Sequence, residues 1–303
     1  MKVGVIGLGG IAQKAYLPTY IKLQDRGEFV FATRNKEVQT RLSTQYGLPE
    51  LKNNLQELIV EGIEACFIHT ATSSHYELIK TCLLANIHVF VDKPISENIE
   101  EVTELQALAK ERQCILMVGF NRRFAPMVEK LKQIPEKRTL ILQKNRAYSE
   151  QPTAFEIFDL FLHLVDTAVY LLDDEIISST SRIRESETGM EIAVLHLETA
   201  TATAILSMDL KSGANREVFQ VTAPSGTTIV ENLIDFKTVT SVEQSESFND
   251  WQTTLEKRGF QQMVEVFLDA LETGVQQELK QENIWLSHQL CHEMLRHHQE
   301  NSN

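Results

Sequence analysis

An apolar segment in the middle of the chain carries three ionisable side chains, Asp159, His163 and Asp166. Such groups are costly to bury unless each of them has a partner. On a helix, Asp159 and His163 stand four residues apart and project from one face, and a carboxylate beside an imidazole orients the ring and raises its basicity. The spacing is typical of a general acid–base pair. It is equally typical of an Asp–His pair satisfied within a core, and the segment taken alone favours the core pair.

A glycine pattern near the start of the chain, GxGxxA, predicts a binding site for a dinucleotide. It follows a strand-like run and opens a helical stretch, where Gly7 permits a tight turn, Gly9 lets the backbone approach a pyrophosphate and Ala12 allows close helix–strand packing. The start of that helix, at Gly10 and Ile11, offers N–H groups and a positive dipole end to the phosphates. The alternative is a glycine-rich turn without a ligand, but the strand signals that follow favour the dinucleotide.

The end of the second predicted strand bears on which dinucleotide binds. An acid that binds the ribose 2′-hydroxyl is usual there. No acid occurs before Glu37, and Thr33 and Arg34 stand in its place. Because the fork of an arginine matches phosphate oxygens, the sequence favours NADP(H), with NAD(H) still possible. The alternative is a solvated surface arginine without a preference.

The third predicted strand ends in a run of small side chains, Thr70, Ala71 and Thr72, followed by His75. Ligands of an open α/β sheet bind at the carboxyl ends of its strands. We therefore expect these residues to lie along the cofactor. The alternative is an ordinary loop in which Ser73 or Ser74 caps the next helix.

Further candidate site residues lie at the ends of the fourth and fifth predicted strands. Pro94 restricts Lys93 to an extended conformation, which holds an ammonium group at the rim of the sheet, next to Asp92 at the cofactor. Asn121 and Arg122 follow the fifth strand and are candidates to bind the substrate. The alternative is that Arg122 and its neighbour Arg123 form salt bridges between domains.

Strand and helix signals alternate up to Gly119, which predicts βαβ units and a parallel sheet covered on both faces. The predicted strands are 3–6, 29–32, 65–69, 87–91 and 115–118, and the predicted helices are 37–46, 75–84 and 99–111. Beyond Gly119 the predicted elements are a helix at 126–133, a strand at 140–148, the apolar helix, strands at 192–197, 204–210, 217–222 and 227–230, and helices at 255–271 and 282–297. Capping boxes are expected at Asn98 with Glu101 and at Thr153 with Glu156.

This organisation predicts two domains in a chain of 303 residues, since single cores stop growing at about 250–300 residues. Residues 1–121 are expected to form an α/β Rossmann domain with a doubly wound parallel sheet. Residues 122–303 are expected to form an α+β domain with a large open, mainly antiparallel sheet. The closing helices are free to pack back on the first domain.

Composition excludes several classes of function. The formal net charge is −13, and no Lys/Arg run offsets it, so binding to nucleic acid is not expected. The four cysteines form no CxxC pair and have no zinc spacing, which predicts no metal site and a reducing compartment. The first residues lack the pattern of a signal peptide, so none is expected, and the longest apolar run is shorter than the roughly 20 residues of a membrane span. We expect a cytoplasmic protein without a membrane partner.

Taken together, the motifs resemble the glucose–fructose oxidoreductase, inositol dehydrogenase and rhizopine-catabolism (Gfo/Idh/MocA) family over nearly the whole chain. The matching pieces are Gly7–Ala12, the loop ending in His75, Asp92–Lys93–Pro94 where the family has Glu-Lys-Pro, Gly119–Arg123, and the spacing of Asp159, His163 and Asp166. In Gly7–Tyr16, Val91–Pro94 and Val118–Pro126 the chain is similar to the branch of oxidoreductases labelled virulence-factor homologues.

The resemblance implies an NAD(P)-dependent oxidoreductase that transfers hydride between nicotinamide and a hydroxyl or carbonyl carbon of a sugar, polyol or related small molecule. It implies that Lys93 and His163 handle the proton, that Asp159 holds His163 or a substrate hydroxyl, and that Phe161 lies at the substrate where the family often has glycine. It also implies a homodimer or homotetramer joined through the open sheet. Two alternatives stay open: a non-catalytic NADP(H) sensor or regulator, and a redox-assisted glycosidase or lyase of the same fold.

Overall fold

The computed structural model describes residues 1–302, and the packing divides the chain into two compact units. The first unit consists of Met1–Gly119 together with Phe260–Gln281. The second unit consists of Phe120–Gly259 together with the segment from Glu282 onward. The domain limits expected from the sequence, 1–121 and 122–303, stay a prediction, because compact packing alone does not show which part of a chain folds independently.

Among the described residues, five parallel strands form the sheet of the first unit, in the order β2-β1-β3-β4-β5. Apart from the residues at their starts, these strands are buried, as expected for a parallel sheet covered on both faces. The order reverses between β1 and β3, which is the kind of switch point where open α/β sheets bind ligands. The bounds are β1 (Lys2–Ile6), β2 (Glu28–Ala32), β3 (Ala65–Ile68), β4 (His88–Val91) and β5 (Leu116–Val118).

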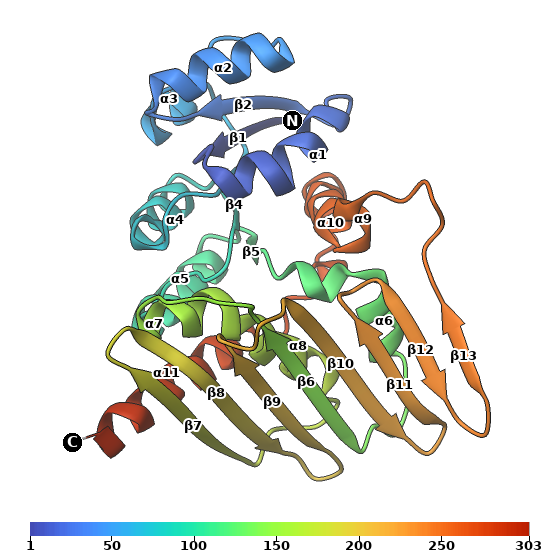
Figure 1. Ribbon diagram of the computed structural model, residues 1–303. Coiled ribbons are helices and arrows are strands. Elements are labelled where there is room, and N and C mark those ends of the chain that lie inside the picture. The colour runs from blue at the N-terminus through green and yellow to red at the C-terminus, as the bar shows by residue number, and fades with distance from the viewer. Residues whose placement is uncertain (303) are drawn as a thin grey trace. The chain divides into compact units, whose positions relative to one another are not determined.

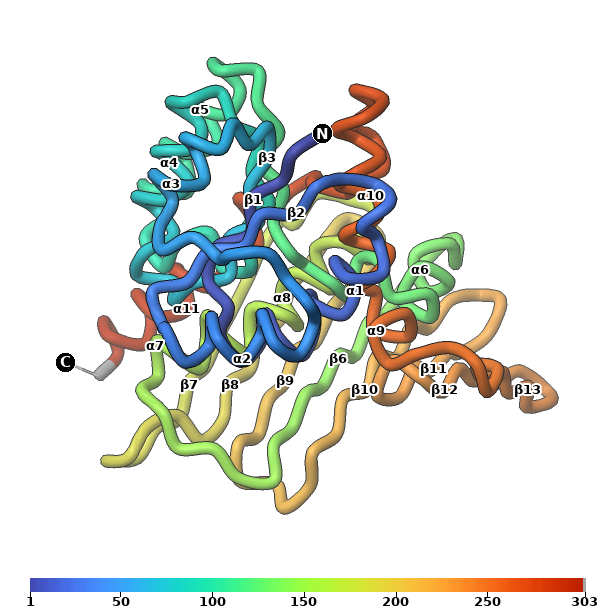
Figure 2. Tube along the Cα trace, turned by 90° about the horizontal axis from the view of Figure 1, so that it is seen from above, coloured from blue at the N-terminus to red at the C-terminus, as the bar shows by residue number. Residues whose placement is uncertain are grey.

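Helices cover this sheet, and one of them comes from far along the chain. Figure 2 shows α10, coloured near the C-terminal end of the scale, beside the blue segments of this unit. The ring of Phe267 in α10 lies 5.1 Å from that of Phe67 in β3 and 5.7 Å from that of Phe90 in β4. Gln281 then accepts the main-chain N–H of Val118 at 2.7 Å, on the edge strand β5. The bounds are α1 (Leu17–Lys22), α2 (Lys36–Tyr46), α3 (Leu55–Val60), α4 (His75–Leu84), α5 (Ile99–Glu111) and α10 (Phe260–Thr273).

The second unit is built on a sheet that has eight strands within the described part of the chain, in the order β13-β12-β11-β10-β6-β9-β8-β7 (Figure 1). Neighbours are antiparallel except for β6 and β9. In the central strands every second residue is buried, so one face packs against helices and the other is open. The bounds are β6 (Thr139–Asn145), β7 (Ser178–Ser186), β8 (Gly189–Glu198), β9 (Thr203–Asp209), β10 (Arg216–Ala223), β11 (Gly226–Glu231), β12 (Asp235–Val239) and β13 (Glu243–Glu246).

One buried helix, α8, is central to the helical layer of the second unit, and His163 is its one residue that is not buried. α11 packs along α8 and against β7. The two sheets with their helices confirm the predicted fold class, a parallel Rossmann sheet followed by a large, mainly antiparallel one. The bounds are α6 (Pro126–Lys132), α7 (Thr153–Glu156), α8 (Leu162–Leu171), α9 (Thr254–Lys257) and α11 (Ile284–Ser302).

Both predicted capping boxes are wrong. Asn98 does cap α5 through its side chain, but Glu101 bonds the hydroxyl of Ser96 instead of returning to the cap. α7 begins without a side-chain cap, and Glu156 accepts a hydrogen bond from Ser149. In each case the acid has a nearby serine hydroxyl as its partner, and that contact replaces the return bond to the backbone.

The helix predicted at 255–271 is interrupted at Gly259, which separates α9 from α10. Gly259 has φ +77°, and a Cβ there would lie 2.3 Å from the carbonyl oxygen of Asn121. Only glycine fits this close approach of two backbones. A complete capping box between Thr253 and Glu256 starts the short helix before the break.

No helix among residues 1–302 is long and apolar enough to cross a membrane. Within the same residues, no group of three or more His, Cys, Asp and Glu side chains is arranged to hold a metal ion. The four cysteines are free, and three of them are buried.

Candidate functional site

The glycine loop of the first unit leaves β1 at the switch point of the sheet. Gly7 has φ +92°, and a Cβ there would lie 2.6 Å from the backbone of both His69 and Thr70, at the end of β3. This close approach requires glycine. A Cβ on Gly9 or Gly10 would meet nothing within 4 Å. The loop is therefore tight where it touches the sheet and open where the start of a helix faces a pyrophosphate, which is the arrangement that a dinucleotide needs.

A π-helical turn, Ala12–Tyr16, follows this loop, and its end is marked by the N–H of Leu17 bonding to the carbonyl of Ala12. The turn places the Tyr16 hydroxyl 3.2 Å from Oδ1 of Asp92, which also accepts the main-chain N–H of Lys93 at 3.0 Å. Burial raises the pKa of the Asp92 carboxyl, against the opposing effect of Lys93. Asp92 thus joins the helix after the glycine loop to the segment that carries the half-buried Lys93.

The loops after β3 and β4 are tied together by His75. Its Nδ1 lies 2.8 Å from the carbonyl oxygen of Pro94, and its Nε2 lies 3.1 Å from that of Thr70. The ring is buried, and burial lowers its pKa against the effect of the two carbonyls. Ser74 stands at the start of α4, yet its hydroxyl bonds Thr70 and Ala71 rather than the helix N–H groups. The site residues that follow these two strands therefore share one hydrogen-bonded frame.

The end of β2 presents Arg34 to solvent. Thr33 Oγ1 accepts the N–H of Asn35 at 3.4 Å, and the Asn35 side chain caps α2. The neighbouring cation Lys36 is held by Asn53 and Gln39 through hydrogen bonds of 2.6 and 3.1 Å. Of the two residues expected to select the dinucleotide, Thr33 is engaged in the local turn and Arg34 extends outward.

The predicted acid–base residues of the second unit lie on a helix that changes its winding. Ile157–Phe161 is a π-helical turn, in which the N–H of Leu162 bonds to the carbonyl of Ile157. From 156 to 172 the residues that are not buried are Asp159, Leu160 and His163. An otherwise buried helix therefore presents one short strip that contains both candidate groups. Phe161 is fully buried, so its side chain belongs to the core. A π-turn of this kind is frequent at functional sites.

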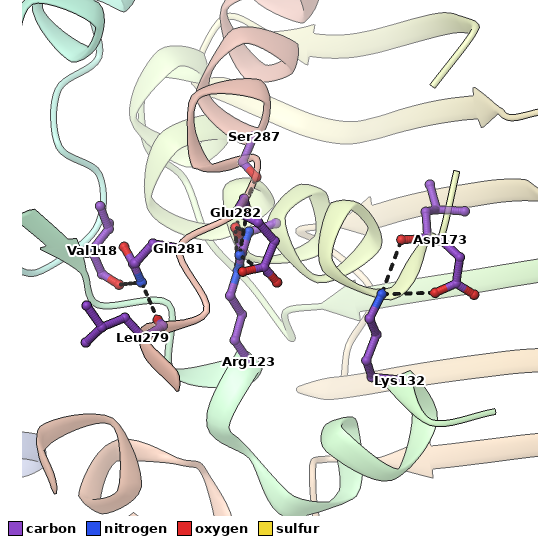
Figure 3. Close-up of polar contacts among 10 residues, drawn as sticks. Val118, Arg123, Lys132, Asp173, Leu279, Gln281, Glu282 and Ser287 are labelled. Carbon is purple, nitrogen blue, oxygen red and sulfur yellow. Dashed lines mark hydrogen bonds and ion pairs between the residues drawn. The ribbon is translucent and has the colours of Figure 1, made fainter. Parts of the chain in front are cut away.

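Asp166 belongs to a different network, of which Figure 3 labels Arg123, Glu282 and Ser287. The Asp166 carboxylate accepts hydrogen bonds from the guanidinium of Arg123 at 2.7 to 3.2 Å and from the Ser287 hydroxyl at 3.0 Å. Arg123 also donates to the main-chain carbonyl of Glu282 at 2.8 Å. The side chains of Arg123 and Asp166 are 0% and 1% exposed. This network joins α8 to the start of α11 and is structural.

Arg122 lies at the centre of a second buried cluster. Its Nε and Nη2 donate to the two carboxylate oxygens of Glu217 at 2.6 and 3.0 Å. Its Nη1 lies 2.7 Å from Nδ1 of His163 and 3.2 Å from Oδ1 of Asn121. Lys144 donates to Glu217 at 3.1 Å, and these two residues are register partners across β6 and β10. Arg122, expected to hold a substrate, is thus directed into the protein and toward His163.

The buried charges of this cluster shift the pKa values of Glu217 and Lys144. Burial alone would raise the pKa of the Glu217 carboxyl, but the charges of Arg122 and Lys144 outweigh burial and hold that pKa well below its ordinary range. Burial, together with repulsion from Arg122, lowers the pKa of the Lys144 ammonium to about 7. Arg122 is therefore the fixed cation of the cluster.

Sequence reasoning missed Lys144 and Glu217, although a signal for them existed. In β6 the buried residues Leu140 and Leu142 are followed by Lys144 in the same phase, and in β10 Glu217 precedes the buried Phe219 in phase. A charged residue on the buried phase of an alternating strand requires a partner. Two such residues in separate strands indicate a cross-strand pair.

The fold and the glycine loop define a protein with a Rossmann unit suited to a dinucleotide. Residues 1–120 match the GFO_IDH_MocA family, described as "Oxidoreductase family, NAD-binding Rossmann fold", and residues 126–241 match the YceM-like C-terminal domain. The chain belongs to the Gfo/Idh/MocA oxidoreductase family, as the motifs had suggested.

Individual relatives agree with this assignment. The chain is 32% identical over 281 residues to YceM of Salmonella typhimurium, which is named as an oxidoreductase, with 90% of each protein covered. It is 27% identical over 229 residues to the myo-inositol 2-dehydrogenase of Thermotoga maritima, covering 71% of this chain and 66% of the relative. The crystal structure of the dehydrogenase MviM from Clostridium difficile is similar with a TM-score of 0.92 and 27% identity, covering 98% of this chain and 99% of that one.

Proposed function

We propose that the protein transfers hydride between a nicotinamide dinucleotide and a hydroxyl or carbonyl carbon of a sugar, polyol or related small molecule. The observation that carries the proposal is the partly exposed strip of Asp159, Leu160 and His163 on an otherwise buried helix. A helix in a core has no structural need for an acid and an imidazole on one strip. The relation to a myo-inositol 2-dehydrogenase supports the class of substrate.

The residues of each unit have separate tasks in this proposal. Gly9 and Gly10 hold the pyrophosphate at the start of the helical segment, and the loops tied by His75 lie along the remainder of the dinucleotide. When bound, the nicotinamide supplies the acceptor or donor of hydride. Lys93 or His163 takes or supplies the proton of the reacting oxygen, and Asp159 orients the imidazole or a substrate hydroxyl.

A two-stage experiment tests the proposal. The purified protein is titrated with NADPH and NADH, and binding is followed by nicotinamide fluorescence or heat. A panel of sugars, polyols and their phosphates is then added, and the change in nicotinamide absorbance is recorded. Binding followed by a net absorbance change supports the proposal. Binding without turnover of any compound favours a sensor, turnover without net absorbance change favours a redox-assisted lyase or glycosidase, and no binding by folded protein refutes the proposal.

NADP(H) is the favoured cofactor in this proposal, with NAD(H) possible, and Arg34 is the residue that distinguishes them. The Arg34→Ala variant is expected to bind NADPH about 10- to 100-fold more weakly, because hydrogen bonds to a charged group contribute about 1.5–3 kcal/mol. NADH binding should be unchanged, since NADH has no 2′-phosphate. Lys36→Ala is the matched control, because Lys36 is a neighbouring cation held by Asn53. Equal losses for both dinucleotides would refute the assignment to Arg34.

We also propose that the open face of the second sheet joins subunits into a homodimer or homotetramer. Ile141 and Ile205 are register partners on this face, and each is 39% exposed. Apolar groups gathered on a flat face mark an interaction surface. The Ile141→Asp variant is expected to sediment as a monomer. Val60→Asp, at an exposed aliphatic residue of the first unit, should leave the assembly intact, and a monomeric parent protein would contradict the proposal.

A further inference from the structure

The contact between Arg122 and His163 decides which nitrogen of the imidazole carries the proton. Nη1 of Arg122 lies 2.7 Å from Nδ1 of His163. A guanidinium has N–H donors and no acceptor, and it stays charged in proteins. At this distance Nδ1 must therefore accept the hydrogen bond through its lone pair. A neutral imidazole whose Nδ1 accepts has its proton on Nε2.

The guanidinium is not free to turn away from the ring. Glu217 holds it through two parallel hydrogen bonds, and Asn121 accepts a further one. The side chains of Arg122 and Glu217 are 6% and 8% exposed. Bidentate pairs of this kind fix direction as well as distance. The orientation of Arg122, and with it the state of His163, is set by a strand of the second sheet.

The charges around the ring support the same state. Arg122 is the permanent cation of the cluster, Lys144 has its pKa lowered to about 7, Glu217 is the anion, and Asp159 lies on the partly exposed strip of the same helix as His163. A second proton on Nδ1 would place an N–H group against the N–H of Arg122. It would also add a charge beside a guanidinium in a buried region, where like charges repel strongly.

We propose that Arg122 fixes His163 in the tautomer with the proton on Nε2, so that His163 donates a hydrogen bond to the substrate oxygen and is not the base of the reaction. Arg122 is then a positioning residue, and Lys93 receives and returns the proton. This inference rests on the proposed function for the role of the two side chains, whereas the tautomer itself depends only on the second unit.

The reaction balances with these roles. In the oxidising direction, the C–H bond of the substrate breaks and its electron pair leaves with the hydride for the dinucleotide. The hydroxyl proton passes to Nζ of Lys93, and the oxygen becomes a carbonyl oxygen that accepts from Nε2–H of His163. In the reducing direction Nε2–H polarises the carbonyl, and Lys93 returns the proton. His163 keeps its own proton throughout.

Nitrogen NMR of the unliganded protein tests the tautomer directly. The chain has nine histidines, so the ¹⁵N-histidine-labelled protein is compared with a His163→Gln variant to assign the signals of His163. We expect Nδ1 in the range of a lone-pair nitrogen and Nε2 in the range of a protonated one.

Two variants distinguish the effect of Arg122 on the His163 tautomer from the effect of the other charges in the cluster. Arg122→Gln replaces a pure donor by an amide that donates and accepts, so His163 should populate both tautomers. Lys144→Met removes a cation from the same cluster without touching the ring, and the signals of His163 should stay as in the parent protein. Once a substrate is known, kcat of Arg122→Gln should fall by about 10²- to 10⁴-fold, the range for a lost proton-handling group or a wrong tautomer.

The parent spectrum is decisive even if a variant does not fold. A protonated Nδ1 in the parent protein overturns the inference. If Lys144→Met changes the His163 signals as much as Arg122→Gln does, the assignment of the tautomer to Arg122 is overturned. Failure of the proposed function has a different result: the NMR signals are as expected, but the protein binds no dinucleotide or turns over no compound of the panel.

Discussion

The His163→Ala variant is expected to turn over its substrate about 10²- to 10⁴-fold more slowly than the parent protein. The reason is that His163 is the one residue of α8 that is not buried, and its Nε2–H is aligned by Arg122. Dinucleotide binding should be unchanged, because the glycine loop belongs to the first unit. Turnover is measured by nicotinamide absorbance and binding by fluorescence titration.

The control for this prediction is His297→Ala. His297 lies in α11, where its Nε2 is 3.2 Å from Nη2 of Arg296, and its loss should leave turnover unchanged. A His163→Ala protein with the parent's turnover on the true substrate would show that this side chain has no part in the reaction. Parallel loss of dinucleotide binding would instead indicate a general disturbance of the fold.

The Asp166→Ala variant is expected to lower the free energy of unfolding of the second unit by about 3–5 kcal/mol, because it leaves the Arg123 charge buried without its partner. Both residues are inaccessible to solvent, and Ser287 loses its acceptor as well. Both tryptophans of the chain, Trp251 and Trp285, belong to the second unit. Urea unfolding followed by tryptophan fluorescence therefore reports on this unit, and the midpoint should fall without a change in slope.

Two controls test the cause of that loss. Arg26→Ala removes an ion pair with Asp269 and Glu272 whose acids are well exposed, and it should cost less than about 1 kcal/mol. A double variant, Arg123→Met with Asp166→Leu, removes both buried charges and should recover much of the stability. If Asp166→Ala unfolds at the parent's midpoint, the network of Arg123 does not stabilise the fold.

Local patterns predicted the architecture well. The five strands of the first sheet begin and end within one residue of their predicted limits, and the helices at 75–84 and 99–111 match α4 and α5. Apolar runs and the glycine pattern depend on neighbours along the chain, so a sequence displays them directly. The break at Gly259 was not predicted, because a contact with Asn121, far away in the sequence, causes it.

The partners of the site residues were harder to predict than the residues themselves. His163 and Lys93 stand out by type and place, but the arginine that orients His163 lies 41 residues before it, and the acid that holds this arginine lies 95 residues further along from the arginine. Such pairs depend on the order of strands in the second sheet, which the alternation of residues does not encode. The π-turn at Ile157–Phe161 was equally hidden, because one additional residue in a turn leaves no mark on composition.

The return of α10 to the first unit has a consequence for how the protein emerges from the ribosome. Phe67 and Phe90 are synthesised early, but Phe267, which packs against both, comes much later. At about 5–20 residues per second, roughly 7–30 s pass between the completion of the first sheet and the arrival of α10. During that interval the rings of Phe67 and Phe90 lack the cover of Phe267 on the nascent chain. We expect a chaperone to bind this exposed aromatic surface.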